Sequence, residues 1–199
     1  MNHTMKRWTL NEIGRQHLTL TETAIPQPGP GEVLVRVSAV ALNFRDKVII
    51  EGGMGKGMPM PFTPGSDMAG VVEAVGPGTS RFKQGDRVIS SFNADWIEGK
   101  AVNNARNPHY NTLGYALQGV LAEYVVMNEA WLVNAPQTLS DAEACTLVCA
   151  GLTAWFALIE RGGLKAGESV LVQGTGGVAL FALQIARAMG AEVFITSSS

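Results

Sequence analysis

The sequence predicts a β-rich amino-terminal domain followed by the start of a doubly wound parallel α/β sheet, and three observations support this. Up to about residue 135, short runs of alternating apolar residues are separated by turns rich in glycine and proline. Beyond Pro136 the apolar period lengthens from two residues to about 3.6. Near the end of the chain, two β-type runs flank an amphipathic helix that follows a glycine-rich turn. We therefore expect one domain at residues 1–135 and a second at residues 136–199.

The composition is that of a folded protein with balanced charge. Of the 199 residues, 46% are hydrophobic and 16% are charged, which is more apolar material than disordered chains contain. Fifteen Lys and Arg residues oppose 17 acidic residues, which gives a formal net charge of −2. Because no long run of one charge sign occurs, we expect no nucleic-acid partner.

The amino terminus, an uncharged stretch at residues 144–159 and the two cysteines bear on location. Residues 1–9 lack the apolar segment of a signal peptide. Residues 144–159 contain no charged side chain. They are fewer than the ~20 residues that a membrane span needs, so we expect a buried helix there. Cys145 and Cys149 stand four apart on that stretch, and about 5–6 Å between their Cβ atoms is too far for a disulfide. We expect reduced thiols, a cytoplasmic location and no membrane association.

The first domain contains several short strand-like runs. They lie at residues 18–21, 32–40, 69–75, 87–91 and 121–127. Many short strands at near-regular spacing indicate a barrel or a sandwich. Residues 92–119 have weak periodicity and are expected to form a long loop, which is uncommon unless it is functional or mobile. Aromatic residues of that loop could line a substrate site or could simply anchor the loop.

A glycine-rich turn opens the helix of the second domain. Gly174, Gly176 and Ala179 have the spacing G-x-G-x-x-A, between a β run at 168–173 and a helix at 178–189. The first glycine permits a tight turn, the second lets the backbone approach a pyrophosphate, and the small third residue lets the helix pack on the strand. Free N–H groups at the start of the helix bind the anion. The pattern predicts a dinucleotide site, and a glycine turn without a ligand is the alternative.

The predicted contacts of that site continue at the end of the second β run, residues 192–196. An enzyme that binds NAD usually places Asp or Glu about 20 residues beyond the glycines, and Ser197 is found there instead. A carboxylate would repel a 2′-phosphate, whereas hydroxyl groups tolerate it, so NADP is favoured over NAD. The serines could also be ordinary loop residues. The expected cofactor contacts are Gly174, Thr175, Gly176, Gly177, Val178, Ser197 and Ser198.

Seven segments, in order along nearly the whole chain, resemble the medium-chain dehydrogenase/reductase superfamily. They are residues 28–35, 41–46, 64–70, 85–88, 121–124, 151–155 and the glycine turn at 174–179. The resemblance implies a GroES-like β-barrel at residues 1–135, followed at residues 136–199 by the beginning of a Rossmann NAD(P)-binding domain.

Zinc-binding alcohol dehydrogenases of that superfamily use two cysteines and a histidine as catalytic ligands. At the matching positions this chain has Asn43, Ser66 and Cys149. A single thiolate does not hold catalytic Zn²⁺, which takes three protein ligands and a water. Residues 92–119 also lack the cysteines of a structural zinc lobe. The resemblance is therefore to the zinc-free, quinone oxidoreductase-like branch, and we expect no metal.

That branch implies an NADPH-dependent oxidoreductase that transfers hydride to a quinone or an α,β-unsaturated carbonyl. Asn43 is expected beside the nicotinamide, where its amide can donate to the cofactor or to a substrate oxygen; it could instead be a turn residue that bonds its own backbone. Thr153 matches a threonine that lines the nicotinamide pocket, or is an ordinary helix hydroxyl. Asp46 is expected to be structural. Water or Tyr115 could supply a proton.

The chain has two of the six strands of a doubly wound sheet. We therefore expect a piece of a longer parent protein, and the activity and a homodimer are expected of that parent. Two other functions stay open. One is a non-catalytic GroES-like binding module with a vestigial cofactor arm, and the other is a zinc-type alcohol dehydrogenase.

Overall fold

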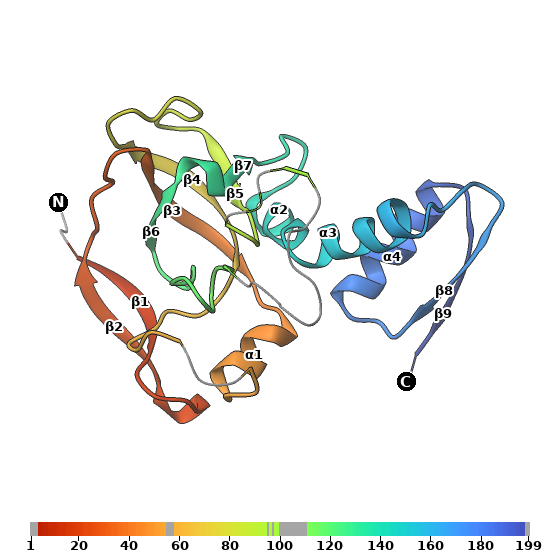
Figure 1. Ribbon diagram of the computed structural model, residues 1–199, viewed down its shortest axis with the longest axis horizontal. Helices are drawn as coiled ribbons and strands as arrows, with labels where there is room; N and C mark the ends of the chain where they lie inside the picture. Colours follow the sequence, from red (N-terminus) through yellow and green to blue (C-terminus); the bar gives the residue numbers. More distant parts are fainter. Residues whose placement is uncertain (1–3, 55–57, 95, 97, 100–110, 198–199) are drawn as a thin grey trace. The chain divides into compact units, whose positions relative to one another are not determined.

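The chain divides into two compact units, Met1–Cys145 and Thr146–Ser199, which are coloured along the sequence in Figure 1. The computed structural model describes residues 4–54, 58–94, 96, 98–99 and 111–197. Helix α2 (Asp141–Ala144) packs on strands of the first unit, so the segment after residue 135 belongs to that unit by its contacts. The domain boundary predicted from the change of apolar period stays a prediction.

The first unit is built on two antiparallel sheets. The larger has the strand order β6-β3-β4-β5-β7. Its strands are β3 (Glu32–Ala41), β4 (Asp67–Val75), β5 (Arg87–Ser90), β6 (Tyr124–Asn128) and β7 (Leu132–Asn134). The smaller pairs β1 (Thr4–Leu10) with β2 (Leu18–Ala24). Single bridges, Arg7 to Ala122 and Leu10 to Phe62, link β1 to other segments, and the described strands form no closed hydrogen-bonded ring.

Two apolar clusters fill this unit. The larger lies along the five-stranded sheet and includes the fully buried Val33, Val35, Met68, Val72, Val88 and Leu132. The alternation read from the sequence puts Val33 and Val35 of β3 on that buried side. The smaller cluster consists of Leu10, Ile49 and Phe62, and it joins helix α1 (Phe44–Ile50) to β1. These two clusters fix the end of β3 against the start of α1.

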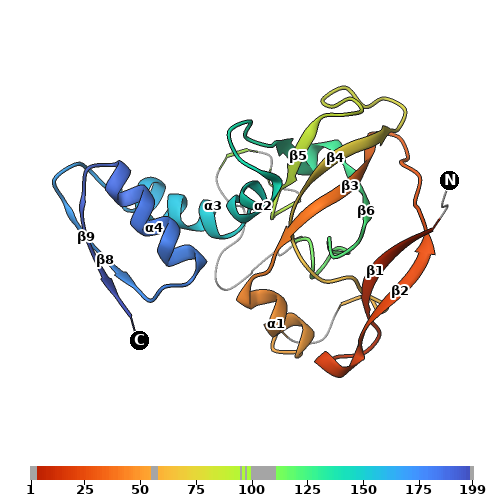
Figure 2. The ribbon, with the colours of Figure 1, turned by 180° about the vertical axis from the view of Figure 1, so that it is seen from behind.

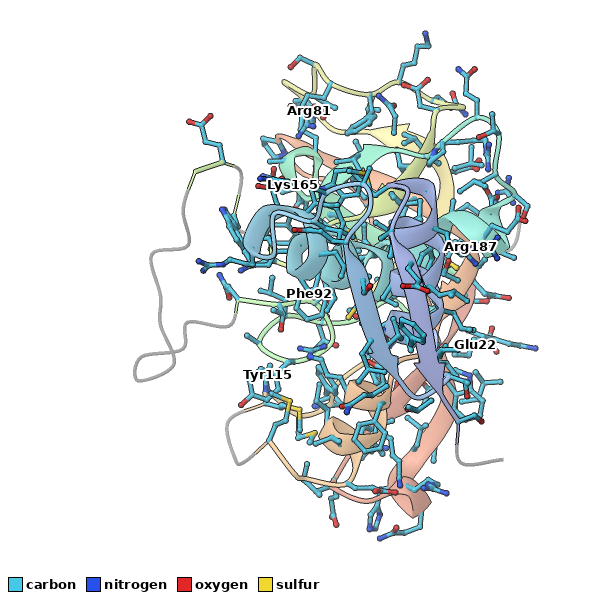
Figure 3. The ribbon with its side chains drawn as sticks, turned by 90° about the vertical axis from the view of Figure 1, so that its right-hand side faces the viewer. Glu22, Arg81, Phe92, Tyr115, Lys165 and Arg187 are labelled. Carbon is cyan, nitrogen blue, oxygen red and sulfur yellow. The ribbon has the colours of Figure 1, made fainter. Side chains whose placement is uncertain are left out.

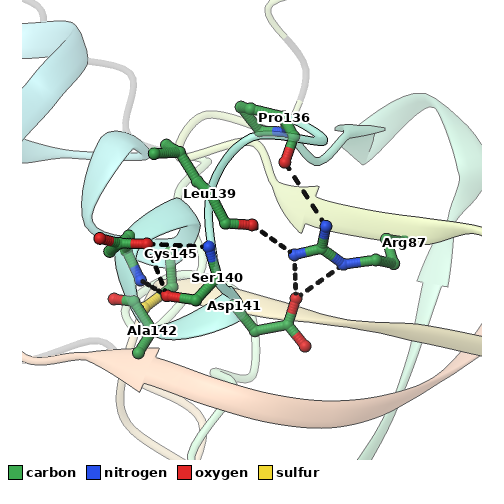
Figure 4. Close-up of polar contacts among 8 residues, drawn as sticks. Arg87, Pro136, Leu139, Ser140, Asp141, Ala142 and Cys145 are labelled. Carbon is green, nitrogen blue, oxygen red and sulfur yellow. Dashed lines mark hydrogen bonds and ion pairs between the residues drawn. The ribbon is translucent and has the colours of Figure 1, made fainter.

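Helix α2 begins with a capping box, and an ion pair joins it to β5 (Figure 4). Ser140 and Glu143 form the predicted capping box: the Ser140 N–H donates to Glu143 Oε2 at 2.8 Å, and the Glu143 N–H donates to Ser140 Oγ at 3.4 Å. Arg87 of β5 donates from Nη2 to Asp141 Oδ1 at 2.6 Å and to the carbonyl of Leu139 at 2.9 Å. This guanidinium therefore binds both the helix and the turn that leads into it.

The second unit contains the predicted strand–helix–strand element. Strands β8 (Ser169–Gln173) and β9 (Glu192–Thr196) pair in parallel, with helix α4 (Gly177–Ala188) between them in the chain. In Figure 2, α4 runs alongside this strand pair, and both strands contact it. The glycine-rich turn, Gly174 to Gly176, joins β8 to α4 as the sequence indicated. This part of the prediction is confirmed.

The uncharged stretch 144–159 is not the single buried helix that the sequence suggested. It forms short segments that end in α3 (Ala150–Trp155) and the π-helical η4 (Phe156–Arg161). Only one side of α3 packs on α4, so Leu152 and Trp155 remain 57% and 45% exposed. Within the described residues no single helix has the length and apolarity to span a membrane, and one bent pair, Asp141–Leu147 with Ala150–Arg161, passes that test only jointly.

The ion pair between Arg87 and Asp141 predicts a pH dependence of stability. Hydrogen bonds from Arg87 hold the pKa of Asp141 below its ordinary value of 3.8. Because the folded pKa is the lower one, the carboxylate stabilises the fold above about pH 4, and this contribution is lost as the pH falls through the lowered pKa. Asp141→Asn should reduce the free energy of unfolding by about 1 kcal/mol at pH 7, since the pair is partly open to solvent. Denaturant titrations at several pH values measure this.

The matched control is Glu51→Gln. Glu51 accepts a hydrogen bond from Arg15 at 2.6 Å, but both side chains are exposed, that of Glu51 by 41% and that of Arg15 by 71%. Its removal should change stability little at any pH. A deficit of Asp141→Asn that stayed constant down to low pH would contradict the assignment to the ion pair.

Candidate functional site

Asn43 and Ser66 lie at the same end of the five-stranded sheet. In the antiparallel pairing of β3 with β4, Ala41 stands opposite Asp67. Asn43 follows Ala41 in the chain and Ser66 precedes Asp67, so both residues emerge where this pairing ends. The two positions that the resemblance matched to zinc ligands are therefore neighbours in the fold.

Asn43 caps helix α1 together with Asp46. The Asn43 N–H donates to Asp46 Oδ2 at 2.8 Å, and the Asp46 N–H donates to the Asn43 carbonyl at 3.0 Å. Burial raises the pKa of Asp46, while the hydrogen bond from Asn43 and the charge of Arg45 act in the opposite direction. These contacts give Asp46 the structural role expected for it.

The side-chain amide of Asn43 is not satisfied within the fold. Its Nδ2 atom is buried and has no hydrogen-bond partner among the described residues, and the same is true of Asp46 Oδ1. A buried polar atom without a partner costs about 1–3 kcal/mol. An acceptor that reached Asn43 Nδ2 would remove this cost, so the amide is suited to bind an oxygen from outside the chain.

Ser66 is fully buried and already engaged. Its hydroxyl donates to Asp67 Oδ1 at 2.5 Å, and its carbonyl accepts from Ser90 Oγ at 2.8 Å. An amide at position 43 and an engaged hydroxyl at position 66 are not the thiolate and imidazole that Zn²⁺ takes. Cys149 belongs to the second unit. Cys145 and Cys149 are free thiols, and burial raises the pKa of Cys145.

Arg45, which the sequence analysis did not single out, anchors the loop at residues 92–119. Its guanidinium donates to the carbonyl of Leu113 at 3.2 Å and lies 4.9 Å from the ring centre of Phe92, which Figure 3 labels together with Tyr115. The Tyr115 ring is 6.0 Å away, and the Tyr115 hydroxyl donates to the carbonyl of Met54 at 3.1 Å. No local pattern around Arg45 in the sequence indicates this stacking, because its partners lie far along the chain.

The two ends of the central part of that loop are paired with each other. Asn93 forms a β-bridge with Thr112, and the Ala94 N–H donates to the carbonyl of Asn111 at 3.1 Å. Residues 95, 97 and 100–110, which include part of the predicted substrate loop, lie outside the described residues. The chain therefore leaves and re-enters the described fold at one place.

The two glycines of the turn in the second unit differ in what requires them. Gly174 has φ +83°, a conformation that favours glycine, and its N–H donates to the Thr196 carbonyl at 3.0 Å. Gly176 has φ −74°, which any residue adopts, and a Cβ placed there would meet no described atom within 4 Å. Nothing in the described fold explains a glycine at Gly176.

The start of α4 presents unused backbone donors. The Leu180 N–H donates to the carbonyl of the capping residue Gly176 at 3.0 Å. The N–H groups of Gly177, Val178 and Ala179 precede it in the first turn and therefore have no partner within the helix. A Cβ at Gly177 would lie 3.4 Å from Ala150, and Ala179 is buried. Gly177 therefore lets α4 pack closely on Ala150 of α3, while the packing of Ala179 on the strand stays a prediction.

The predicted site residues fall in both units. The second unit brings Thr196 at the end of β9 against the glycine turn, where Thr196 Oγ1 also accepts from the Gly174 N–H at 3.3 Å. Ser197 follows as an exposed residue, Thr153 is exposed on α3, and Ser198 lies outside the described residues. Asn43 belongs to the first unit. The sequence analysis missed Thr196, although its place at the end of the second strand was a usable signal.

Residues 29–137 match the alcohol dehydrogenase GroES-like domain. The chain belongs to the medium-chain dehydrogenase/reductase superfamily. A zinc-type alcohol dehydrogenase-like protein of Schizosaccharomyces pombe is 41% identical over 189 residues, which are 94% of this chain and 54% of that protein. Human quinone oxidoreductase is 35% identical over 180 residues, which are 90% of this chain and 48% of that protein.

A solved structure supports the same membership in the superfamily. A Sinorhizobium meliloti 1021 protein assigned as an alcohol dehydrogenase has a TM-score of 0.96 and 55% identity, and the match covers 100% of this chain and 58% of that one. The predicted GroES-like domain and the start of a Rossmann domain are confirmed at the level of the fold. The chain spans about half the length of the curated relatives it matches.

The two glycines of the turn should respond differently to alanine. Gly174→Ala places a side chain at φ +83° and should destabilise the second unit by about 1–2 kcal/mol. Gly176→Ala meets no described atom and restricts the unfolded chain, so it should leave stability unchanged or raise it by about 0.4–1 kcal/mol. Urea denaturation followed by circular dichroism tests both. A large loss of stability in Gly176→Ala would show that packing requires this glycine.

Proposed function

We propose that the protein containing this chain is an NADPH-dependent, zinc-free oxidoreductase that transfers hydride to a quinone or an α,β-unsaturated carbonyl. The observation that supports this most directly is the glycine at position 176, which the described fold does not need and which a bound pyrophosphate would. Membership in a superfamily of oxidoreductases agrees with it.

The chain's own residues would hold the cofactor at the glycine turn. The N–H groups of Gly177 and Val178 would bind the pyrophosphate, while Gly174, Thr175 and Gly176 keep the backbone close to it. Ser197 and Ser198 would lie toward the ribose that bears the 2′-phosphate. Thr153 would line the nicotinamide pocket. When bound, NADPH supplies the hydride, and the protein supplies position and electrostatics.

In this proposal Asn43 stabilises the charge that develops on the substrate oxygen. Its Nδ2 is buried and lacks an acceptor in the fold, so a donor is already desolvated and in place. Asp46 keeps the backbone of Asn43 fixed through the cap. Water or Tyr115 would then supply the proton, although the Tyr115 hydroxyl is engaged with the Met54 carbonyl here.

Zinc does not fit the residues present. Asn43 offers an amide, Ser66 offers a hydroxyl held by Asp67, and Cys149 is a single thiol. The name of the Schizosaccharomyces pombe relative nevertheless favours a zinc-type alcohol dehydrogenase as a second candidate. Stoichiometric zinc in a metal analysis of the purified protein would favour that candidate. The cytoplasmic location and the homodimer stay predictions.

A parallel titration with NADPH and NADH, followed by nicotinamide fluorescence, tests the cofactor assignment. We expect saturable binding with preference for NADPH, and binding of Gly176→Ala weakened roughly tenfold or more, because a methyl group would occupy the place where the backbone approaches the pyrophosphate. The stability of that variant serves as its folding control. Preference for NADH would overturn the role given to the serines, and equal affinity of Gly176→Ala would overturn the role of the turn.

Substitutions of Asn43 test the catalytic assignment in the intact protein. Asn43→Ala should lower turnover roughly 100-fold, the usual cost of removing one donor to a developing oxyanion. Asn43→Ser should lower it similarly while preserving the helix cap, because serine caps helices about as well as asparagine. Steady-state kinetics with a quinone acceptor and a thermal melt of each variant give the two readouts. Normal turnover in Asn43→Ser would contradict this role.

A further inference from the structure

The first unit contains a cavity of about 240 Å³ beside the edge strand β6. Its walls are mainly apolar and include Met5, Leu117, Val125 and Met127. Polar side chains also line it, namely Arg7 of β1, Thr63, Gln118 and Tyr124. No acidic side chain is among its described lining residues, and neither Asn43 nor Ser66 belongs to it. The cavity is thus separate from the candidate catalytic residues of this unit.

Thr63 and Arg7 each carry one buried polar atom without a partner among the described residues. Thr63 is only 3% exposed, and its Oγ1 has no hydrogen-bond partner among the described residues. The Nε atom of Arg7 is also buried and has no hydrogen-bond partner among the described residues. None of the ion pairs found in the described part of the chain involves Arg7. A buried polar atom without a hydrogen-bond partner is costly, so these two atoms require an explanation.

The neighbouring amide does not satisfy them. Gln118 Oε1 accepts from the Thr63 backbone N–H at 2.8 Å, and Gln118 Nε2 donates to the Pro61 carbonyl at 3.1 Å. Both ends of Gln118 are therefore committed to backbone groups, and this fixes Thr63 in place. The hydrogen-bond partners of Thr63 Oγ1 and Arg7 Nε are left to a molecule from outside the described fold.

We propose that this cavity binds a small monocarboxylate with an apolar body. The carboxylate would accept hydrogen bonds from Arg7 Nε and from the Thr63 hydroxyl, and the apolar body would lie against Met5, Val125 and Met127. Water would satisfy either atom singly, whereas a carboxylate offers two acceptor oxygens together with a charge opposite to that of the guanidinium. Inorganic phosphate has no apolar part that could pack against the apolar walls. The volume is below the roughly 300–1,000 Å³ of drug-sized sites, which limits the ligand to a small one.

Calorimetric titration of the protein with sodium benzoate, and with benzamide as a neutral isostere, tests the proposal. Benzoate should bind, and benzamide should bind about tenfold more weakly or worse, since hydrogen bonds to charged groups are the stronger ones. Arg7→Met should weaken benzoate about tenfold or more while leaving benzamide unchanged. Thr63→Val, which keeps the shape, should weaken benzoate as well. Arg15→Met removes an exposed arginine and should change nothing.

Methyl NMR of the methionines locates the ligand. On adding benzoate, the Met5 and Met127 methyl signals should shift, and that of the exposed Met60 should not. Should Arg7→Met fail to fold, Arg7→Lys keeps the charge and removes Nε, and should still weaken binding. Absence of benzoate binding, equal binding of benzamide, or benzoate affinity unaffected by Arg7→Met would each overturn the proposal. None of these outcomes depends on the dinucleotide turn, so the proposed function is tested separately.

Discussion

The central position of β3 is the constraint on which the first unit depends. This strand pairs with β6 from Glu32 to Arg36 and with β4 from Val33 to Ala41, so its last residues have a neighbour on one side only. The pairing with β4 is close: a Cβ at Gly70 would lie 2.4 Å from the Arg36 carbonyl. The pairing with β4 fixes the point at which the chain leaves β3. Asn43 therefore lies at the end of the sheet where β4 begins, and it is bonded to Asp46 at the start of α1.

Orphaned polar atoms and an unexplained glycine identify the places where this chain is suited to other molecules. Asn43 Nδ2 and Thr63 Oγ1 are buried donors or acceptors that the described fold leaves unpaired. Gly176 is a backbone position that the described fold leaves uncovered. The backbone of Asn43 is held by its hydrogen bond to Asp46, and the backbone of Thr63 by its hydrogen bond to Gln118. The unpaired atoms are therefore incomplete interactions in a fixed backbone rather than defects of packing.

Local signals in the sequence predicted local structure well. The capping box of Ser140 and Glu143, and the strand, turn and helix around Gly174, depend on residues a few positions apart. Helix α1 and strands β1 and β7 were missed because they are short or pair with distant segments, which leaves little periodicity to detect. Arg45 and Thr63 could not be found from the sequence, since their roles depend on partners dozens of positions away.

The paired ends of the loop have a consequence for how this fold can change. Asn93 and Thr112 stand opposite each other, and Ala94 and Asn111 share a hydrogen bond, so the segment between them starts and finishes at one point of the scaffold. The entropy of closing such a segment grows only slowly with its length, by about 0.6 kcal/mol for each doubling. A change in the number of residues between 94 and 111 therefore costs little in closure entropy, as long as the pairing of Asn93 with Thr112 is kept.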